Sequence, residues 1–163
     1  MRLRDNPIIE VSRKLDCTPE RAWELVTDIT LPTSADGELF AAEWLDDADA
    51  VAVGARFVGH NRNDTLGEWS TTSVITEVED GRRWVWSVGP EDAQPWAVWG
   101  FEVEPAREGS IVRQWARFGA GDSPLRGFID AQPEKEARII SGRMAVWQAG
   151  MEANLDVVAA AIA

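Results

Sequence analysis

Residues 67–88, GEWSTTSVITEVEDGRRWVWSV, determine the fold because they contain two strand-like segments joined by a short turn. The turn, EDGRR at residues 79–83, is typical of an antiparallel hairpin. In a strand, alternate side chains share one face, so Trp84, Trp86 and Val88 point the same way. The question is whether this tryptophan-rich face meets a packed core, a partner protein or a cavity.

The strand-like pattern continues on both sides of this hairpin, over residues 51–118. Its five segments of strand length read GARFVGHNR, GEWSTTSVITEVE, RRWVWSVG, AVWGFEVEP and SIVRQWARFG. The loops between them are short, and short loops join antiparallel neighbours. The segment IIEVSRKL at residues 8–15 predicts a further strand near the start of the chain.

Helices are expected before and after the strand region. Thr18 is the expected N-cap of a first helix, with Pro19 at its first position, where the missing N–H costs nothing. A second short helix is expected within the segment LPTSADGELFAAEWLDD, residues 31–47, with Leu39, Phe40 and Trp44 along one side. Residues 119–132 are expected to form a loop. After Pro133, apolar residues recur at steps of three or four and predict one long amphipathic helix: Ile140, Met144, Trp147, Met151, Leu155, Val158 and Ile162.

This order of elements predicts an α+β fold in which the sheet packs against the long helix. The chain has 163 residues, and we expect one domain over residues 1–163 because a chain of this length can bury a sufficient core by itself. The sequence contains nine tryptophans and no tyrosine. Each indole buries about 150–250 Å², so the tryptophans carry much of any core or pocket.

The composition argues against several classes of function. With 28 acidic and 16 basic residues, the net charge of −12 repels phosphate backbones, so nucleic acid is not an expected partner. A single cysteine, Cys17, allows no intrachain disulfide and no cysteine-based metal site, and we predict neither a metal nor a cofactor. No apolar run is long enough to span a membrane and the N-terminus lacks a signal-peptide core, so we expect a cytoplasmic protein.

Charged residues at every second strand position mark the solvent face of the predicted sheet. The opposite face then carries seven aromatic residues: Phe57, Trp69, Trp84, Trp86, Trp99, Phe101 and Phe118. A few polar residues lie among them, namely Asn61, Thr71, Ser73 and Gln114. A buried amide or hydroxyl without a partner costs about 1–3 kcal/mol, so these groups bond each other, trapped water or a ligand. The pattern describes a small-molecule pocket and equally a thick core.

Several segments together resemble a known family. They are CTPERAWELVTDI, AEWLDD, GARFVGHNR, VITEVEDGRRWVW, the W-x-F-x-V-E-P motif at residues 99–105, EGSIVRQ and GMEANL. In this order they resemble the START/Bet v 1-like (SRPBCC) superfamily, and more narrowly the bacterial polyketide cyclase/dehydrase-like proteins, over nearly the whole chain. The resemblance implies a helix-grip fold, a curved antiparallel sheet wrapped around a long C-terminal helix with two short helices after the first strand. It also implies a cavity between sheet and helix.

The expected function is therefore the binding of a small hydrophobic molecule, such as a lipid, an aromatic compound or a polyketide. We expect the ligand to contact the inner face of the sheet and the stripe of the long helix, at Phe57, Asn61, Trp69, Ser73, Trp86, Trp99, Phe101, Gln114, Met144 and Trp147.

Two alternatives stay open. The first is an enzyme of the cyclase or dehydratase type, in which Asn61, Ser73 and Gln114 position the substrate. No catalytic residue is predicted, because the only histidine, His60, falls on the solvent face. The second is an interaction module with a collapsed cavity, in which an outward Trp115 binds a partner or forms a homodimer, with Trp96 also outside.

Overall fold

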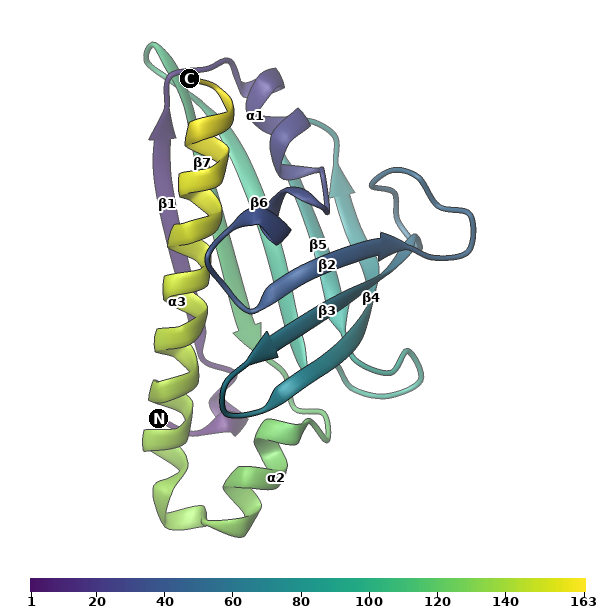
Figure 1. Ribbon diagram of the computed structural model, residues 1–163, viewed down its shortest axis with the longest axis vertical. Helices are drawn as coiled ribbons and strands as arrows, with labels where there is room; N and C mark the ends of the chain where they lie inside the picture. Colours follow the sequence, from purple (N-terminus) through teal and green to yellow (C-terminus); the bar gives the residue numbers. More distant parts are fainter.

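The computed structural model describes residues 1–163 and contains a seven-stranded antiparallel sheet with a long helix, α3, along one side (Figure 1). The order of the strands in the sheet is β1-β7-β6-β5-β4-β3-β2. The strands are β1 (Ile8–Leu15), β2 (Leu39–Trp44), β3 (Arg56–Asn63), β4 (Gly67–Glu79), β5 (Arg83–Val88), β6 (Ala97–Ala106) and β7 (Gly109–Phe118). The helices are α1 (Pro19–Val26), α2 (Pro124–Ala131) and α3 (Glu136–Ala161), with single turns η1 (Leu3–Asp5), η2 (Leu31–Ser34) and η3 (Pro133–Lys135).

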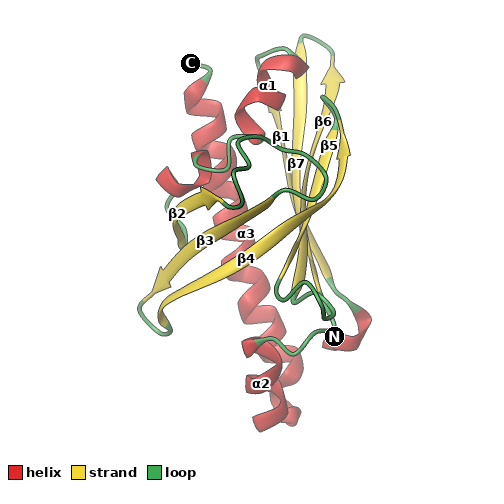
Figure 2. Ribbon diagram, turned by 90° about the vertical axis from the view of Figure 1, so that its right-hand side faces the viewer, coloured by secondary structure: helices red, strands yellow, loops and turns green.

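The sheet is strongly twisted and wraps around α3. Figure 2 shows β2, β3 and β4 lying across the direction of α3, whereas β1, β6 and β7 run nearly along it. The register of β4 shifts between Ile75 and Glu77 where it pairs with β5, and such a bulge increases the local bend and twist. The helix-grip fold implied by the resemblance is confirmed. No helix, α3 included, has both the length and the apolar character that a membrane crossing requires.

The hairpin predicted at residues 79–83 is present between β4 and β5. Gly81 has a φ of 76°, a conformation that glycine adopts without a steric penalty. In the adjoining pair of strands, Trp86 lies opposite Trp99 and Trp84 lies opposite Phe101. The register therefore brings the aromatic side chains of β5 and β6 together on one face.

Two predicted elements were wrong. Residues 39–44 form the edge strand β2, which pairs with β3 and places Trp44 opposite Phe57. The alanines in this segment favour a helix locally, but cross-strand pairing and burial outweigh that preference.

The predicted loop at residues 119–132 contains α2. Its start repeats the signal that was recognised in α1, where the Thr18 side chain accepts a hydrogen bond from the Arg21 N–H at 3.2 Å. In α2 the Ser123 side chain accepts from the Arg126 N–H, also at 3.2 Å, and proline again occupies the first helical position.

The hydrophobic core divides into clusters at the two ends of α3. At the C-terminal end, Leu155 and Val158 pack with β1, α1 and the inner face of the sheet in the largest cluster. At the other end, Ile140 packs with Phe118, with Ile129 of α2 and with Leu3. The space between these clusters, bounded by the sheet and by α3 from Arg138 to Asn154, contains the candidate site.

Candidate ligand-binding cavity

A cavity of about 990 Å³ lies between the inner face of the sheet and α3, along the helix from Arg138 to Asn154. Pockets for small molecules typically measure about 300–1,000 Å³, so this one accommodates a drug-sized ligand. All of the aromatic residues that side-chain parity assigned to the inner face line it: Phe57, Trp69, Trp84, Trp86, Trp99, Phe101 and Phe118. The inner face of the sheet therefore borders a cavity, and Phe57, Trp84 and Phe101 also pack in the largest core cluster.

Stacked aromatic rings form a continuous wall from the sheet onto α3. Trp84 and Trp86 stack with ring centroids 4.3 Å apart, and Trp86 stacks on Trp99 at 6.4 Å. Trp99 contacts Trp147 of α3 at 4.9 Å, and Trp147 stacks on Phe118 at 4.3 Å. Because each ring is held by its neighbours, the wall is preformed and offers flat apolar surface to a ligand.

The Trp84 indole fixes one end of this wall. It is 2% exposed, and its Nε1–H donates to the backbone carbonyl of Val26 at 3.1 Å, at the end of α1. A buried indole N–H is costly without a partner, so this bond allows Trp84 to lie in the apolar interior.

The cavity wall has few polar side chains, and only some of them hydrogen-bond another protein group. The Gln114 Oε1 accepts a hydrogen bond from the Asn154 Nδ2 of α3 at 3.0 Å, which satisfies part of the buried amide. Asn61 of β3 and Ser73 of β4 line the same cavity, and neither side chain hydrogen-bonds another protein group. The polar atoms of Asn61 and Ser73 are therefore available to a bound molecule.

An ion pair crosses the side of the cavity. The Arg143 guanidinium of α3 binds both carboxylate oxygens of Glu38, at 2.8 and 2.9 Å, and the Asn63 Nδ2 donates to Glu38 at 2.6 Å. The guanidinium also lies 5.9 Å from the ring centroid of Trp69 and 6.0 Å from that of Trp147. The pair joins the segment before β2 to the first half of α3, and sequence reasoning missed it because its members are far apart in the chain.

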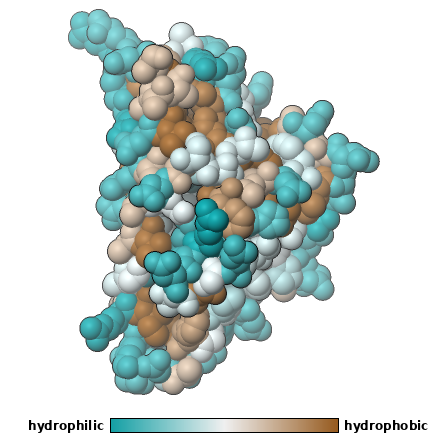
Figure 3. Space-filling model, in the orientation of Figure 1, coloured by the Kyte–Doolittle hydropathy of each residue, from teal (hydrophilic) through white to brown (hydrophobic).

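Exposed apolar side chains mark the opening of the cavity, here called the mouth. They are Leu66 of the β3–β4 turn, Phe128 of α2 and Val146 of α3, which are 47%, 50% and 43% exposed. Lys135 and Arg138, at the start of α3, also line the cavity there and are exposed. Figure 3 shows hydrophobic surface over α2 and the beginning of α3.

The structure places every residue predicted to contact a ligand around this cavity except Met144. Met144 lies on the neighbouring flank of α3 and packs against the cluster of Leu3, Phe118, Ile129 and Ile140. The apolar stripe of α3 therefore has two roles. Trp147 and Met151 line the cavity, whereas Met144 packs in the hydrophobic core beside it.

The interaction-module hypothesis predicted that Trp115 and Trp96 are exposed on the outer face of the protein, and this prediction was wrong. Trp115 does point to the outer face of the sheet, but it is only 8% exposed. Its ring packs flat against Gly100 and is covered by the Arg83 guanidinium, 5.2 Å from the ring centroid. Trp96, also expected outside, lines the cavity.

His60 lies on the outer face, as parity indicated. Its Nδ1 lies 2.6 Å from the Ser70 Oγ and its Nε2 lies 3.4 Å from a Glu43 carboxylate oxygen. His60 is not among the residues that line the cavity, so its imidazole is directed away from a ligand bound there.

Groups with shifted pKa values lie on the outer surface. A hydrogen bond from Lys14, together with its positive charge, lowers the pKa of Asp16. A hydrogen bond to Asp46 and the charge of Glu91 raise the pKa of Arg56. Neither Asp16 nor Arg56 lines the cavity, so these shifts do not prepare a group for chemistry there. No cluster of three or more His, Cys, Asp or Glu side chains is placed to hold a metal ion.

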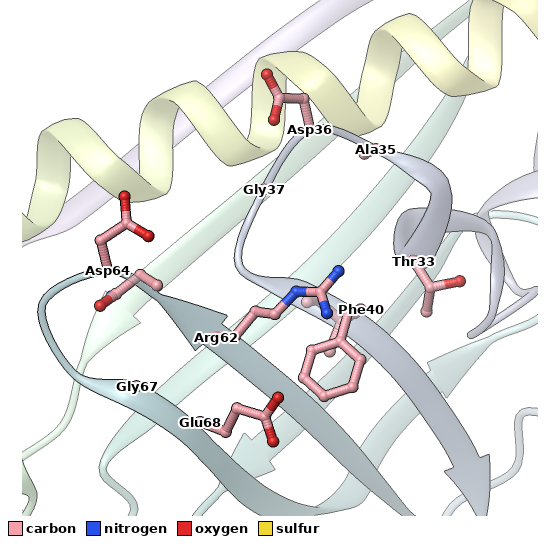
Figure 4. Close-up of a pocket in the computed structure, with 11 residues that line it drawn as sticks. Thr33, Ala35, Asp36, Gly37, Phe40, Arg62, Asp64, Gly67 and Glu68 are labelled. Carbon is pink, nitrogen blue, oxygen red and sulfur yellow. The ribbon is translucent and has the colours of Figure 1, made fainter.

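A second hollow, of about 540 Å³, lies on the outside of β2 and β3 (Figure 4). Arg62 lies over the Phe40 ring there, 4.6 Å from its centroid, with the carboxylates of Asp36, Asp64 and Glu68 around the hollow. It has charged groups and no aromatic wall, so the inner cavity is the candidate site.

Comparison with known proteins gives one family and several similar structures. The sequence matches the family described as polyketide cyclase/dehydrase and lipid transport over residues 7–162. No curated protein matches the sequence.

Similar solved structures cover almost the whole chain. The polyketide_cyc-like protein Cgl2372 from Corynebacterium glutamicum has a TM-score of 0.59 and 24% identity, covering 92% of this chain and 88% of that one. The di-domain ARO/CYC BexL from the BE-7585A biosynthetic pathway has a TM-score of 0.70 and 10% identity, covering 96% of this chain and 51% of BexL. Ara h 8.0201 has a TM-score of 0.56 and 11% identity, covering 92% and 98%. These structures share the fold, and the sequence match establishes that the protein belongs to the polyketide cyclase/dehydrase and lipid transport family.

Proposed function

We propose that the protein binds a small apolar molecule in the cavity between the sheet and α3. The observation that carries this proposal is the preformed aromatic wall around a cavity of about 990 Å³. Burial of apolar surface contributes about 25 cal/mol per Å², and the indoles add stacking with a planar ligand. A ligand with a flat or branched apolar body therefore gains most from this site.

The residues of the wall have two roles in this proposal. The apolar body of the ligand contacts Phe57, Trp69, Trp86, Trp99, Phe101 and Trp147. A carbonyl or hydroxyl group of the ligand pairs with the free polar atoms of Asn61 and Ser73, and Gln114 offers the hydrogen-bonding capacity that Asn154 leaves unused. Such pairing avoids the cost of burying these polar groups unsatisfied.

A titration with N-phenylnaphthylamine (NPN), a neutral dye that fluoresces in apolar surroundings, tests the proposal. We expect wild type to bind one NPN molecule and Trp86→Ala and Trp99→Ala each to raise the Kd roughly tenfold, because each change removes a stacking surface. Trp115→Phe is the matched control, since Trp115 lies on the outer face of the same sheet. Unchanged affinity in both cavity variants would exclude this wall as the binding surface.

A second candidate function is cyclisation of a poly-β-keto substrate held in the same cavity. Two observations favour it, namely the unpaired polar side chains of Asn61 and Ser73 and the family to which the chain belongs. In this case the polar residues position carbonyl groups and the wall holds the folded chain. Turnover of a linear poly-β-ketone that is lost in the triple alanine variant of Asn61, Ser73 and Gln114 supports this function. Binding without turnover by wild type excludes it and leaves the binding function intact.

A further inference from the structure

Some charged side chains that line the cavity have a partner that satisfies their charge or hydrogen bonds, and others form no ion pair. Arg143 is neutralised by the bidentate contact with Glu38. Asp28, near the end of α1, accepts hydrogen bonds from the Thr30 N–H and Oγ1 at 2.9 and 2.7 Å. At the opposite end of the cavity, Lys135 and Arg138 form no ion pair, and the Lys135 ammonium donates only to the Gln132 side chain. The lining therefore presents two free cations at the mouth.

The position of these cations relates them to the apolar wall. Lys135 ends η3 and directly precedes α3, and Arg138 lies in the first turn of α3, so both exposed cations lie near the junction of η3 and α3. They share the mouth with Phe128 of α2 and Val146 of α3. Glu134 and Glu136 flank Lys135 in the sequence but do not line the cavity, whose charged lining residues are three cations and two carboxylates: Lys135, Arg138, Arg143, Asp28 and Glu38.

We propose that the ligand is an apolar anion whose body fills the cavity and whose single anionic group, such as a carboxylate, binds Arg138 and Lys135 at the mouth. This inference rests on the proposed binding function. Burial of an unpaired carboxylate deep in the cavity is strongly unfavourable, whereas at the mouth the group keeps part of its hydration and gains two cationic partners. The planar guanidinium of Arg138 matches both oxygens of a carboxylate.

Two dyes with the same skeleton separate the charge from the apolar body. Anilinonaphthalene sulfonate (ANS) carries one sulfonate that NPN lacks. We expect the double variant Lys135→Gln and Arg138→Gln to raise the Kd for ANS about three- to tenfold, since exposed ion pairs are individually modest, and to leave the Kd for NPN unchanged. High salt is expected to weaken ANS binding by wild type and not NPN binding.

Arg107→Gln is the control for the loss of a positive charge away from the site, because Arg107 is exposed in the β6–β7 turn and does not line the cavity. Displacement of NPN by naphthoate at a roughly three- to tenfold lower concentration than by naphthamide extends the test from a sulfonate to a carboxylate. Equal weakening of ANS and NPN in the double variant, no weakening of either, or the same loss of ANS affinity in Arg107→Gln would overturn the anion site while the binding function stands. If neither dye binds wild type, the proposed function fails and the anion site fails with it.

Discussion

At the scale of single residues, Gly100 and Trp115 show how closely the outer face of the sheet is packed. They lie opposite each other in the β6–β7 register. A Cβ atom added at residue 100 would lie 2.6 Å from the Trp115 ring, closer than carbon atoms approach without displacement. The indole therefore covers the strand backbone because residue 100 has no side chain. Val85 and Val98 complete this small outer cluster.

Gly100→Ala is expected to lower the free energy of unfolding by about 1–3 kcal/mol, because the Trp115 ring must move out of a well-packed position. Urea denaturation of the variant measures this change. The control is Gly127→Ala in the exposed middle of α2, where an added Cβ meets no atom within 4 Å. There alanine is expected to raise stability by about 0.5–1 kcal/mol, because it favours a helix more than glycine does. Equal effects of the two changes would contradict this account of the outer face.

The orientation of the aromatic residues on the predicted strands could be read from the sequence, whereas their burial and the position of Trp96 in the loop before β6 could not. Trp86 and Trp99 were assigned to the inner face because charged residues alternate with them, and strand geometry does not depend on the rest of the fold. The same reasoning correctly placed Trp115 outside. Its low exposure depends on Gly100 and Arg83, which become its neighbours only through strand register.

At the scale of elements, the segment before β2 is tied to α3. We call residues 35–38 the strap. A Cβ atom built at Gly37 lies 3.8 Å from the Cα of Gly150 in α3, so strap and helix approach closely. Glu38, whose side chain is 17% exposed, then pairs with Arg143, which is 23% exposed. This partly buried pair holds the edge of the sheet against the helix at the side of the cavity.

A double-mutant cycle with Glu38→Gln and Arg143→Met measures this contact. We expect a coupling energy of about 1–3 kcal/mol in urea unfolding, because the pair is bidentate, partly buried and supported by Asn63. The control cycle uses Arg21 and Glu24 on α1, whose side chains are 47% and 67% exposed, and it is expected to give at most about 0.5 kcal/mol. Equal coupling in the two cycles would mean that the strap pair is an ordinary surface contact.

The elements themselves were predictable where a local signal was strong. The cap at Thr18, the hairpin around Gly81 and the repeat of apolar residues in α3 all depend on neighbouring residues in the chain. Strand β2 was missed because it is an edge strand with alanines at two positions, held by its partner β3. Helix α2 carried a readable cap at Ser123 that the surrounding glycines concealed.

At the scale of the whole molecule, the largest core cluster adjoins the candidate cavity, and the two share Phe57, Trp84 and Phe101. The largest core cluster fills the space between α1, the sheet and the end of α3. The cavity lies beside α3 from Arg138 to Asn154, and its lining residues include Gly142 and Gly150. Since a ligand there binds only the folded chain, occupancy is expected to raise the unfolding temperature.

The residues that line the candidate cavity could largely be predicted from the sequence, whereas the size of the cavity and the charged groups at its edges could not. Strand parity and the helical repeat identify which residues face the space between sheet and helix. The volume of that space, the Glu38–Arg143 pair and the free cations at the mouth depend on how distant segments meet. Met144 illustrates the limit, since it shares the apolar stripe with Trp147 and yet packs beside the cavity.

A crystal structure of the protein grown with a saturating concentration of NPN tests the central claim most directly. The account predicts density for one naphthyl ring between the sheet and α3, in contact with Trp86, Trp99 and Trp147. Density in the polar hollow beside Arg62, or a cavity closed by movement of α3 while NPN occupies the outer surface, would contradict it.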